Sequence, residues 1–208
     1  MTQGQLAERL HVDQGTISRW ERGVESPRPA RRAALSKLLL RDESRRVILR
    51  GLAFVRQDYL PSTLLDSRLR LLEISPSGAR HFRSRGLDPD AMIGISLDRY
   101  AERVGNPEIK GLLHKNLSGS GLLKGDALLF RFVRNRMGKG HATVYEPIFE
   151  DGELIGILNF VTAYFDLPNN GRDTFELIET VRADDPSKAI VMHRGPKADD
   201  AAKALRRI

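Results

Sequence analysis

The side chains that most often carry catalysis or bind metals are few in this chain, and their spacing forms no recognisable set. The sequence contains no cysteine, which excludes disulfides, thiolate catalysis and cysteine-type zinc sites. His81, His114 and His141 form no pair at a metal-ligand spacing such as H-x-x-x-H. The glycine-rich segment 119–125 lacks both the preceding strand and the G-K-[ST] ending of a phosphate-binding loop. We therefore predict no catalytic residue, no metal site and no cofactor, in a protein that is not an enzyme.

The positive charge of the chain is concentrated near its N-terminus. The formal net charge is +7, and residues 1–50 hold 11 Lys and Arg against 6 Asp and Glu, whereas residues 51–168 hold 15 against 14. Because basic side chains supply most of the non-specific affinity of proteins for DNA, this asymmetry fits a nucleic-acid partner, with an ordinary basic tail as the alternative. No apolar run approaches the roughly 18 residues that cross a bilayer, and no apolar signal core begins the chain. We expect a cytoplasmic protein that makes no contact with a membrane.

Three short helices are predicted in the first 40 residues. In TQGQLAERL (2–10) Thr2 is the expected N-cap, and Asp13 is expected to cap a second helix, QGTISRWE. Gly23 follows where the end of a helix favours a left-handed residue. A third amphipathic helix is predicted in ARRAALSKLLL (30–40). The buried faces of the three helices are expected to hold Leu6, Ala7, Leu10, Ile17, Trp20, Ala34, Leu35, Leu38 and Leu39.

Residues 2–27, TQGQLAERLHVDQGTISRWERGVESP, resemble the helix-turn-helix of the Cro and phage-repressor class, also called the xenobiotic-response-element family. The matching features are the T-Q-x-x-L-A start, T-I-S-x-W-E in the second helix, and R-G-x-x-x-P after it. The resemblance implies that QGTISR (14–19) is the recognition helix, which enters the major groove with its N-terminal end towards the bases.

The resemblance also implies roles for six residues of this helix. Gln14 and Arg19 are expected to read base edges, since an amide pairs with adenine and a guanidinium with guanine. Gly15 stands at a base-facing position that usually carries a longer side chain. A side chain that could contact a base is therefore missing at this position. Phosphate contacts, which fix the register on DNA, are expected from Thr16, Ser18 and Arg22. The alternative is that Gln14 and Arg19 only cover a solvated face.

Members of this class have a further helix before the T-Q-x-x-L-A segment, and this sequence starts without it. We expect another part of the molecule to cover Leu6, Ile17 and Trp20, either residues 45–58 or a second subunit. A second hypothesis follows, in which the N-terminal segment is vestigial, does not bind DNA, and belongs to an interaction protein.

Residues 43–59 are predicted to form a connector helix. Ile48, Leu52, Val55 and Tyr59 follow one another in a stripe of coiled-coil type, although Gly51 interrupts it. Two interpretations remain open, a dimerising or signal-transmitting helix and an ordinary helix packed on its own domain.

The pattern changes to short strands and helices from residue 60 onward. STLLDSRLRLLEIS (62–75) predicts two strands joined at residues 66–68, and two or three short helices follow before a helix that starts at Pro107. Three strands are then predicted in DALLFRFVRNR, HATVYEPIFE and ELIGILNFVTAYF, with a hairpin at Asp151-Gly152 between the last two.

Two strands, a run of short helices and a three-stranded antiparallel meander are the element order of a PAS domain. LLDSRLRLLEISPSGARHF and YEPIFEDGELIGILNFVTAY are similar to the first and last parts of that family. The resemblance covers residues 60–167 and implies a sensor or dimerisation domain. The absence of cysteine excludes the adduct-forming light sensors of this class.

The PAS resemblance also implies a pocket or a filled core between sheet and helices. Haem or another ligand of the PAS class is the less favoured alternative to a filled core. If a ligand binds, its expected contacts are Phe82, Met92, Ile95, Tyr100, Leu113, Phe130, Phe132, Tyr145 and Phe160.

Residues 168–208 form a C-terminal extension that matches no motif. TFELIETVRA (174–183) is predicted to be helical, with Phe175, Ile178 and Val181 on one side, SKAIVMHR a strand, and KADDAAKALRRI a short helix. The predicted fold class is α+β, with an all-α helix-turn-helix (1–42) ahead of a PAS-like antiparallel sheet. The predicted function is sequence-specific DNA-binding regulation of transcription by a homodimer, with the PAS-like domain dimerising, sensing a small ligand or partner, or both.

Overall fold

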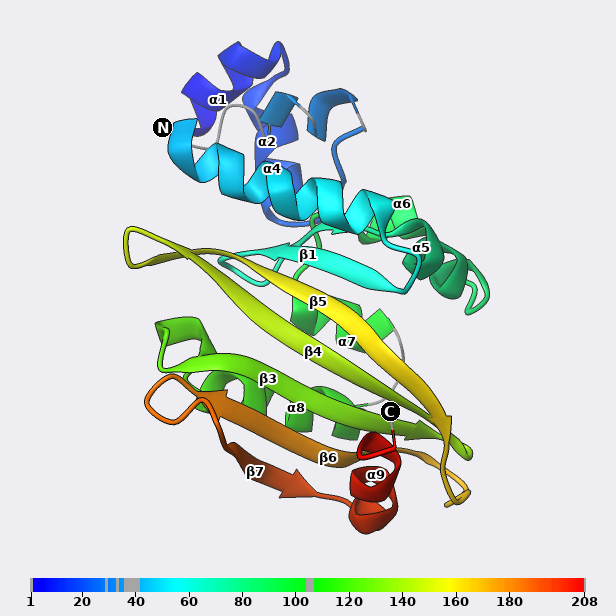
Figure 1. Cartoon of the computed structure of the whole chain (residues 1–208). Helices are drawn as coiled ribbons and strands as arrows, with labels where there is room; N and C mark the ends of the chain where they lie inside the picture. Colours follow the sequence, from blue (N-terminus) through cyan, green and yellow to red (C-terminus); the bar gives the residue numbers. More distant parts are fainter. Residues whose placement is uncertain (1, 29, 33, 36–41, 104–106, 208) are drawn as a thin grey trace.

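The computed structural model describes residues 2–28, 30–32, 34–35, 42–103 and 107–207 of the chain (Figure 1). A group of short N-terminal helices lies at one end of a seven-stranded antiparallel sheet, and further helices cover parts of both faces of the sheet. The predicted α+β class is therefore confirmed. Among the described residues, no helix has the length and apolar character needed to cross a membrane.

The first two helices are capped as the sequence predicts. Helix α1 (Gln3–Leu10) starts at Thr2, whose side chain accepts a hydrogen bond from the backbone N–H of Gln5, while the Gln5 side chain accepts one from the N–H of Thr2. Helix α2 (Gln14–Glu21) starts at Asp13, whose carboxylate accepts from the N–H of Thr16 at 2.7 Å. These caps satisfy backbone donors that have no partner within the helix.

A small core joins α1 and α2 to the segment that follows them. Leu10 and Ile17 are each 1 % exposed, and partly buried Trp20, Ala34 and Leu35 pack against them. Part of the cover that we expected from residues 45–58 is thus supplied by Ala34 and Leu35. The predicted third helix falls largely outside the described residues, as do its Leu38 and Leu39.

Helix α4 (Asp42–Gln57) packs on the sheet. Its buried side chains Ile48 and Val55 contact Leu64 of strand β1, and Gly51 lies so close that a Cβ atom there would stand 3.2 Å from the Leu64 side chain. This favours the interpretation of α4 as a helix packed on its own domain. The predicted stripe was wrong at Tyr59, which lies beyond the helix end and is 94 % exposed.

The strands pair in the order β2-β1-β5-β4-β3-β6-β7. Every pair is antiparallel. The strand bounds are β1 Ser62–Asp66, β2 Leu71–Ile74, β3 Ala127–Arg136, β4 Lys139–Glu150, β5 Glu153–Asp166, β6 Asp173–Arg182 and β7 Ala189–Arg194. The predicted hairpin between β4 and β5 is confirmed, since Asp151 and Gly152 both have positive φ, at 50° and 78°.

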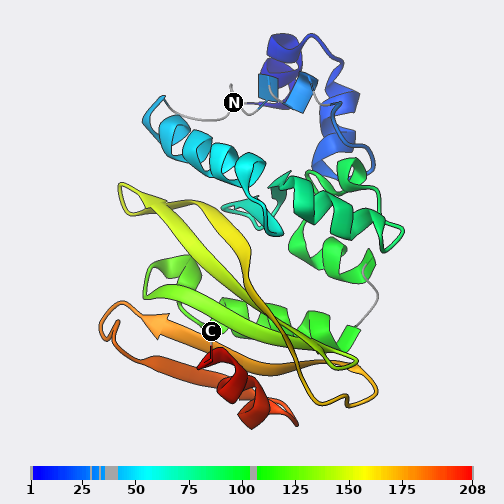
Figure 2. The same ribbon diagram turned by 45° about the vertical axis from the view of Figure 1, so that its right-hand side comes forward.

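All the helices between β2 and β3 lie on one face of the sheet, which we call the inner face. They are α5 (Pro76–Arg83), α6 (Pro89–Met92), α7 (Leu97–Arg103), α8 (Pro107–Gly119) and the 3-10 turn Leu122–Lys124. On the opposite, outer face lie α4 at one end and α9 (Ala198–Leu205) at the other (Figures 1 and 2). The order 2-1-5-4-3 with helices after β2 is the predicted PAS-like arrangement.

The prediction of a helix in residues 174–183 was wrong, because this segment is strand β6. Phe175, Ile178 and Val181 recur every third residue, which imitates a helical face, but the residues between them are also mostly buried. The strand is covered on both faces, by the inner-face helices and by α9, and β-branched Thr174, Ile178, Thr180 and Val181 favour an extended chain. The predicted strand and final helix correspond to β7 and α9.

A buried carboxylate ties the C-terminal extension to the rest of the sheet. Glu176 on β6 is fully buried, and its Oε1 atom accepts hydrogen bonds from Asn135 on β3, from Asn170 and from Thr174, at 3.1, 2.8 and 2.7 Å. Its Oε2 atom accepts from the backbone N–H of Lys197, just before α9, at 2.7 Å. One side chain thus fixes a strand, a loop and the start of a helix.

The substitution Glu176→Ala should lower the free energy of unfolding by about 3 kcal/mol, since it leaves several buried donors without an acceptor. Urea denaturation followed by circular dichroism measures this change. Glu153→Ala, at an exposed position on β5, is the matched control and should change the stability by less than about 0.5 kcal/mol. Equal effects of the two substitutions would show that residues 168–208 do not form part of the folded unit.

Candidate nucleic-acid interface and ligand cavity

Helix α2 presents its first turn to solvent. Gln14 and Gly15 are exposed, Thr16 and Ser18 are partly buried, and Arg22 is exposed beyond the end of the helix. Each of these predicted DNA-contacting residues is thus accessible in full or in part. A Cβ atom on Gly15 would stand 2.9 Å from the capping carboxylate of Asp13, so the glycine allows the close approach of that cap.

Arg19 is engaged in a line of polar contacts along α2. Its Nε atom lies 3.1 Å from Glu25 Oε2, and its Nη2 atom donates to the Thr16 hydroxyl at 2.7 Å. That hydroxyl donates in turn to Asp13 at 2.6 Å, and the hydrogen bonds from Thr16 lower the pKa of Asp13. Arg19 remains 43 % exposed. It must therefore exchange Glu25 for another acceptor before it can bind a base, a competition that the sequence did not reveal.

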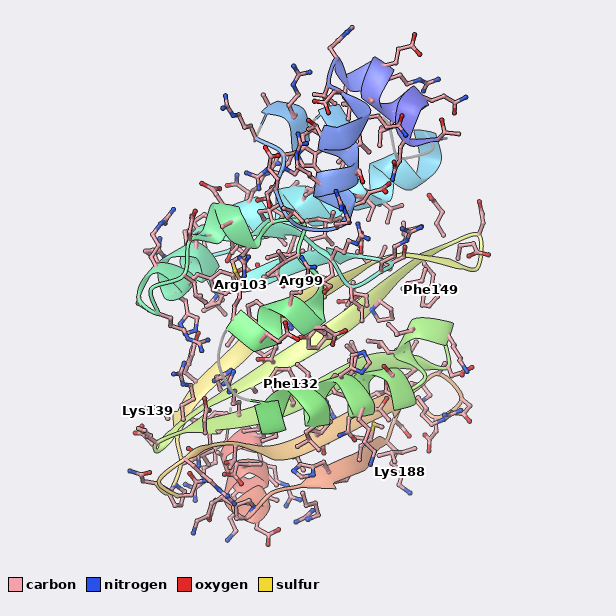
Figure 3. The ribbon with its side chains drawn as sticks, turned by 180° about the vertical axis from the view of Figure 1, so that it is seen from behind. Arg99, Arg103, Phe132, Lys139, Phe149 and Lys188 are labelled. Atoms are coloured by element: carbon pink, nitrogen blue, oxygen red, sulfur yellow. The ribbon has the colours of Figure 1, made fainter. Side chains whose placement is uncertain are left out.

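The segment that follows α2 contacts the helices on the inner face of the sheet. Arg99 of α7 donates to the carbonyl of Gly23 at 3.0 Å, and Ser26 donates to the carbonyl of Ile93 at 3.2 Å. An ion pair of 3.5 Å joins Arg32 to Asp90 of α6. Figure 3 shows Arg99 extending from α7 towards the N-terminal helices. Among the described residues, three polar contacts thus join the helix-turn-helix to α6, to its C-cap residue Ile93 and to α7.

A cavity of about 150 Å³ lies between the sheet and the inner-face helices. Of the nine predicted pocket residues, six line it: Phe82, Ile95, Tyr100, Leu113, Phe132 and Tyr145. In Figure 3 Phe132 lies between α7 and α8. Met92 and Phe130 are buried in the core beside the lining. Phe160 was wrongly placed, because it lies on the outer face, where its ring packs edge-on against Phe54 of α4 at 6.3 Å.

Charged residues that the sequence analysis missed also line this cavity. Alternate residues of β3 face inward, so Phe132 is followed on the same face by Arg134 and Arg136, and Arg134 pairs in register with His141 of β4. His81 and Arg85 reach the cavity from α5 and the turn after it. The sequence FRFVRNR carries this signal, since phenylalanine and arginine share one phase of a period of two.

The two arginines of β3 share one carboxylate. Arg134 donates two hydrogen bonds to Asp173 of β6, at 3.0 and 2.6 Å, and Arg136 lies 3.4 Å from the same carboxylate. Arg85 makes a hydrogen bond with the Tyr100 hydroxyl, although burial is the larger influence and raises the pKa of that phenol. Burial also raises the pKa of Tyr145, which stays protonated.

Both histidines of the cavity are held neutral. Burial, which is the largest cause, together with Arg134 and the neighbouring His81 lowers the pKa of His141 from 6.5 to about 4, against a smaller opposing influence of Asp173. Burial likewise lowers the pKa of His81, together with the charges of Arg85, Arg136 and Arg134. At neutral pH the positive charge of this site therefore comes from its arginines.

Comparison with known proteins finds two kinds of similarity. Residues 1–42 match the family model of the helix-turn-helix. A search of curated proteins gives no match. The chain is similar in structure to the PAS domain of BvgS from Bordetella pertussis, at 18% identity over 59% of this chain and 88% of that one, with a TM-score of 0.44.

Two further solved structures are similar to this chain. One is a Rhodobacter sphaeroides LOV protein, at 16% identity, 61% and 69% coverage of this chain and that one, and a TM-score of 0.40. The other is the PAS domain of an HTR-like protein from Haloarcula marismortui, at 16% identity, 59% and 93% coverage, and a TM-score of 0.35.

The buried histidine predicts a loss of stability in mild acid. Unfolded His141 takes up a proton below pH 6.5, whereas the folded protein resists protonation there until about pH 4, so the free energy of unfolding should fall as the pH decreases between these values. The contribution of His141 to this fall is at most about 3 kcal/mol. The facing charged groups Arg134, Arg136, Asp173 and His81 oppose its protonation in sum. Denaturant titrations at several pH values measure the slope.

His141→Gln should flatten this dependence on pH, because it removes the group that titrates. His11→Asn is the control, since His11 is exposed and has the left-handed backbone that asparagine tolerates. If both variants kept the wild-type slope, burial of His141 would not be the cause.

Proposed function

We propose that this protein is a sequence-specific DNA-binding regulator of transcription whose sheet domain dimerises and senses a small molecule. The observation that carries the proposal is the capped helix pair α1–α2, which matches the helix-turn-helix family and presents Gln14 and Arg19 at the basic end of the chain. An exposed, capped second helix is the geometry that places side chains in the major groove.

The exposed side of α2 supplies the reading groups. Gln14 stands in the first turn, where its amide can pair with adenine, and Arg19 pairs with guanine once its guanidinium leaves Glu25. Gly15 lets the backbone approach the base edges. Thr16, Ser18 and Arg22 contact phosphates and set the register.

A homodimer provides the second recognition helix. Reading of two half-sites about one turn of DNA apart, roughly 34 Å, requires two copies of α2 in a fixed arrangement. Helix α4 and the segment after it expose Leu49 (47 %), Phe54 (48 %), Tyr59 (94 %) and Leu60 (43 %). Such a group of large apolar side chains is typical of a protein–protein contact, so we place the dimer interface there.

Helix α7 links the cavity to the DNA-reading helices. Leu97 and Tyr100 of this helix line the cavity, while Arg99 between them holds the carbonyl of Gly23 immediately after α2 and its C-cap residue Arg22. A ligand that shifts α7 therefore changes the position of the helix-turn-helix relative to the sheet domain. The shift changes DNA affinity only as far as the ligand binds the two arrangements with different affinities.

The DNA-reading role predicts opposite effects of two substitutions. In selection from random duplexes at several salt concentrations, Arg19→Ala should relax the selected sequence at one position and weaken binding by about tenfold, the usual loss for a bidentate base contact. Glu25→Gln should tighten binding, because it releases the arginine from its competing carboxylate.

Arg172→Ala removes the same charge from an exposed loop and is the matched control, which should leave the selected sequence unchanged. If Arg19→Ala and Arg172→Ala behaved alike, α2 would not read bases. Absence of any selected sequence, with binding no tighter than that of a basic peptide, would instead indicate an interaction protein with a vestigial N-terminal segment.

The proposed interface predicts that Phe54→Glu dissociates the dimer. A charge at the centre of a buried apolar contact loses its solvation without gaining a partner, so the variant should be a monomer at concentrations where the wild type is a dimer. Sedimentation equilibrium measures the mass. Met137→Glu, at a position 70 % exposed in the β3–β4 turn, should remain dimeric. A dimeric Phe54→Glu protein would place the interface elsewhere.

A further inference from the structure

The carboxylate that caps α2 lies at the N-terminal end of that helix, the end that the proposed function turns towards the bases. Asp13 is exposed, and two hydrogen bonds from Thr16 hold both of its oxygen atoms. Oδ1 accepts from the backbone N–H at 2.7 Å and Oδ2 from the hydroxyl at 2.6 Å. A carboxylate oxygen accepts more than one hydrogen bond, so each keeps the capacity for a further donor. Asp13 is therefore an exposed acceptor of fixed orientation.

Asp13 and Arg19 meet over Gly15. A Cβ atom on Gly15 would stand 2.9 Å from Asp13 Oδ1 and 3.4 Å from Arg19 Nη1, so both atoms border the space that the missing side chain leaves. Arg19 reaches this place because long side chains on a helix extend towards its N-terminus, over the preceding turn. Thr16 links the two groups, since its hydroxyl donates to Asp13 and accepts from Arg19. A hydrogen-bond acceptor and a donor thus lie side by side on the surface of the recognition helix.

The two carboxylates beside Arg19 differ in how firmly they are held. Glu25 is 53 % exposed and contacts Arg19 through a single hydrogen bond of 3.1 Å. Asp13 is held by two hydrogen bonds within its own helix turn. A base edge can therefore displace Glu25, whereas Asp13 stays beside Arg19 in the groove. A carboxylate in that place is unfavourable unless the DNA offers it a donor, so it also acts against the wrong base pairs.

The arrangement matches one base pair in full. Across the major groove a G·C pair presents the N7 and O6 acceptors of guanine and then the N4 amino donor of cytosine. The guanidinium of Arg19 supplies two donors for guanine, and Asp13 supplies one acceptor for cytosine. An A·T pair instead places the O4 acceptor and the methyl group of thymine in the part of the groove that the carboxylate would occupy.

We propose that Asp13 is a further base-reading residue, which accepts a hydrogen bond from the N4 amino group of the cytosine paired with the guanine that Arg19 reads. The two side chains then span one G·C pair, and Gly15 leaves the space that the edge of this pair occupies. The inference rests on the proposed function. It gives Asp13, which the sequence identifies only as a helix cap, a second role in specificity.

The full chain and a modified duplex test this role. In the duplex that the wild type selects, the cytosine at the position where Arg19→Ala relaxes selection is replaced by 2-pyrimidinone, which lacks the N4 amino group and adds no bulk. The wild type should bind the modified duplex at least about tenfold more weakly. In Asp13→Ser this loss should fall to about twofold or less, because serine caps the helix as well as aspartate but is too short to meet the base. The altered pairing of 2-pyrimidinone with guanine affects both proteins alike.

Glu8→Ser is the matched control, since it removes an exposed carboxylate from α1. It should change the affinity for both duplexes equally and keep the full wild-type loss on 2-pyrimidinone. Circular dichroism of Asp13→Ser should remain that of the wild type, because the cap is retained.

Two results would overturn the role of Asp13 while leaving the proposed function intact. One is a loss on 2-pyrimidinone of less than about twofold by the wild type itself, which needs no variant, and the other is an equal loss by the wild type and Asp13→Ser. Selection of an A·T pair at the position that Arg19 reads would also overturn it. Absence of any selected duplex would overturn the proposed function, and this inference with it.

Discussion

The structure depends on the pairing of β1 with β5. Residues 62–66 form an antiparallel ladder with residues 156–160, so strands about 90 positions apart in the sequence become neighbours. This long-range closure orders the sheet 2-1-5-4-3 and places every helix between β2 and β3 on the inner face. The approach is close at Gly156, where a Cβ atom would stand 2.9 Å from Ile48 of α4 and 3.0 Å from the carbonyl of Leu65. Both the cavity on the inner face and the packing of α4 on the outer face follow from that pairing.

The same pairing of strands places the cavity and the helix-turn-helix on either side of helix α7. Because α6 and α7 lie on the inner face, both contact the segment after α2, and Leu97 and Tyr100 of α7 also line the cavity. Among the described residues, the polar contacts to the helix-turn-helix are two hydrogen bonds to backbone carbonyls and one ion pair between partly buried Arg32 and exposed Asp90, each of modest energy. An interface of this kind changes its arrangement at low cost, which suits the proposed movement of the helix-turn-helix on DNA.

Local signals in the sequence were sufficient for the elements that local chemistry determines. Thr2, Asp13 and the Asp151-Gly152 turn were predicted because capping and turn geometry depend on neighbouring residues. The spacing of Phe175 and Ile178 wrongly predicted a helix. These residues belong to strand β6, which is buried on both faces because α9 covers one face and the inner-face helices cover the other. Arg85 and Arg136 were missed for a related reason, because they meet in one cavity only after α5 has packed on the inner face of the sheet, against β1.

The most direct test of this account is a double-mutant cycle between the cavity and α7, read out as affinity for the DNA duplex that the wild type selects. Val161→Trp fills the cavity from β5, and Arg99→Ala removes the contact with Gly23. The account predicts that Val161→Trp changes DNA affinity in the wild-type background but much less in the Arg99→Ala background, with a coupling free energy of about 1–3 kcal/mol. Additive effects of the two substitutions would contradict it, because the cavity and the recognition helix would then act independently.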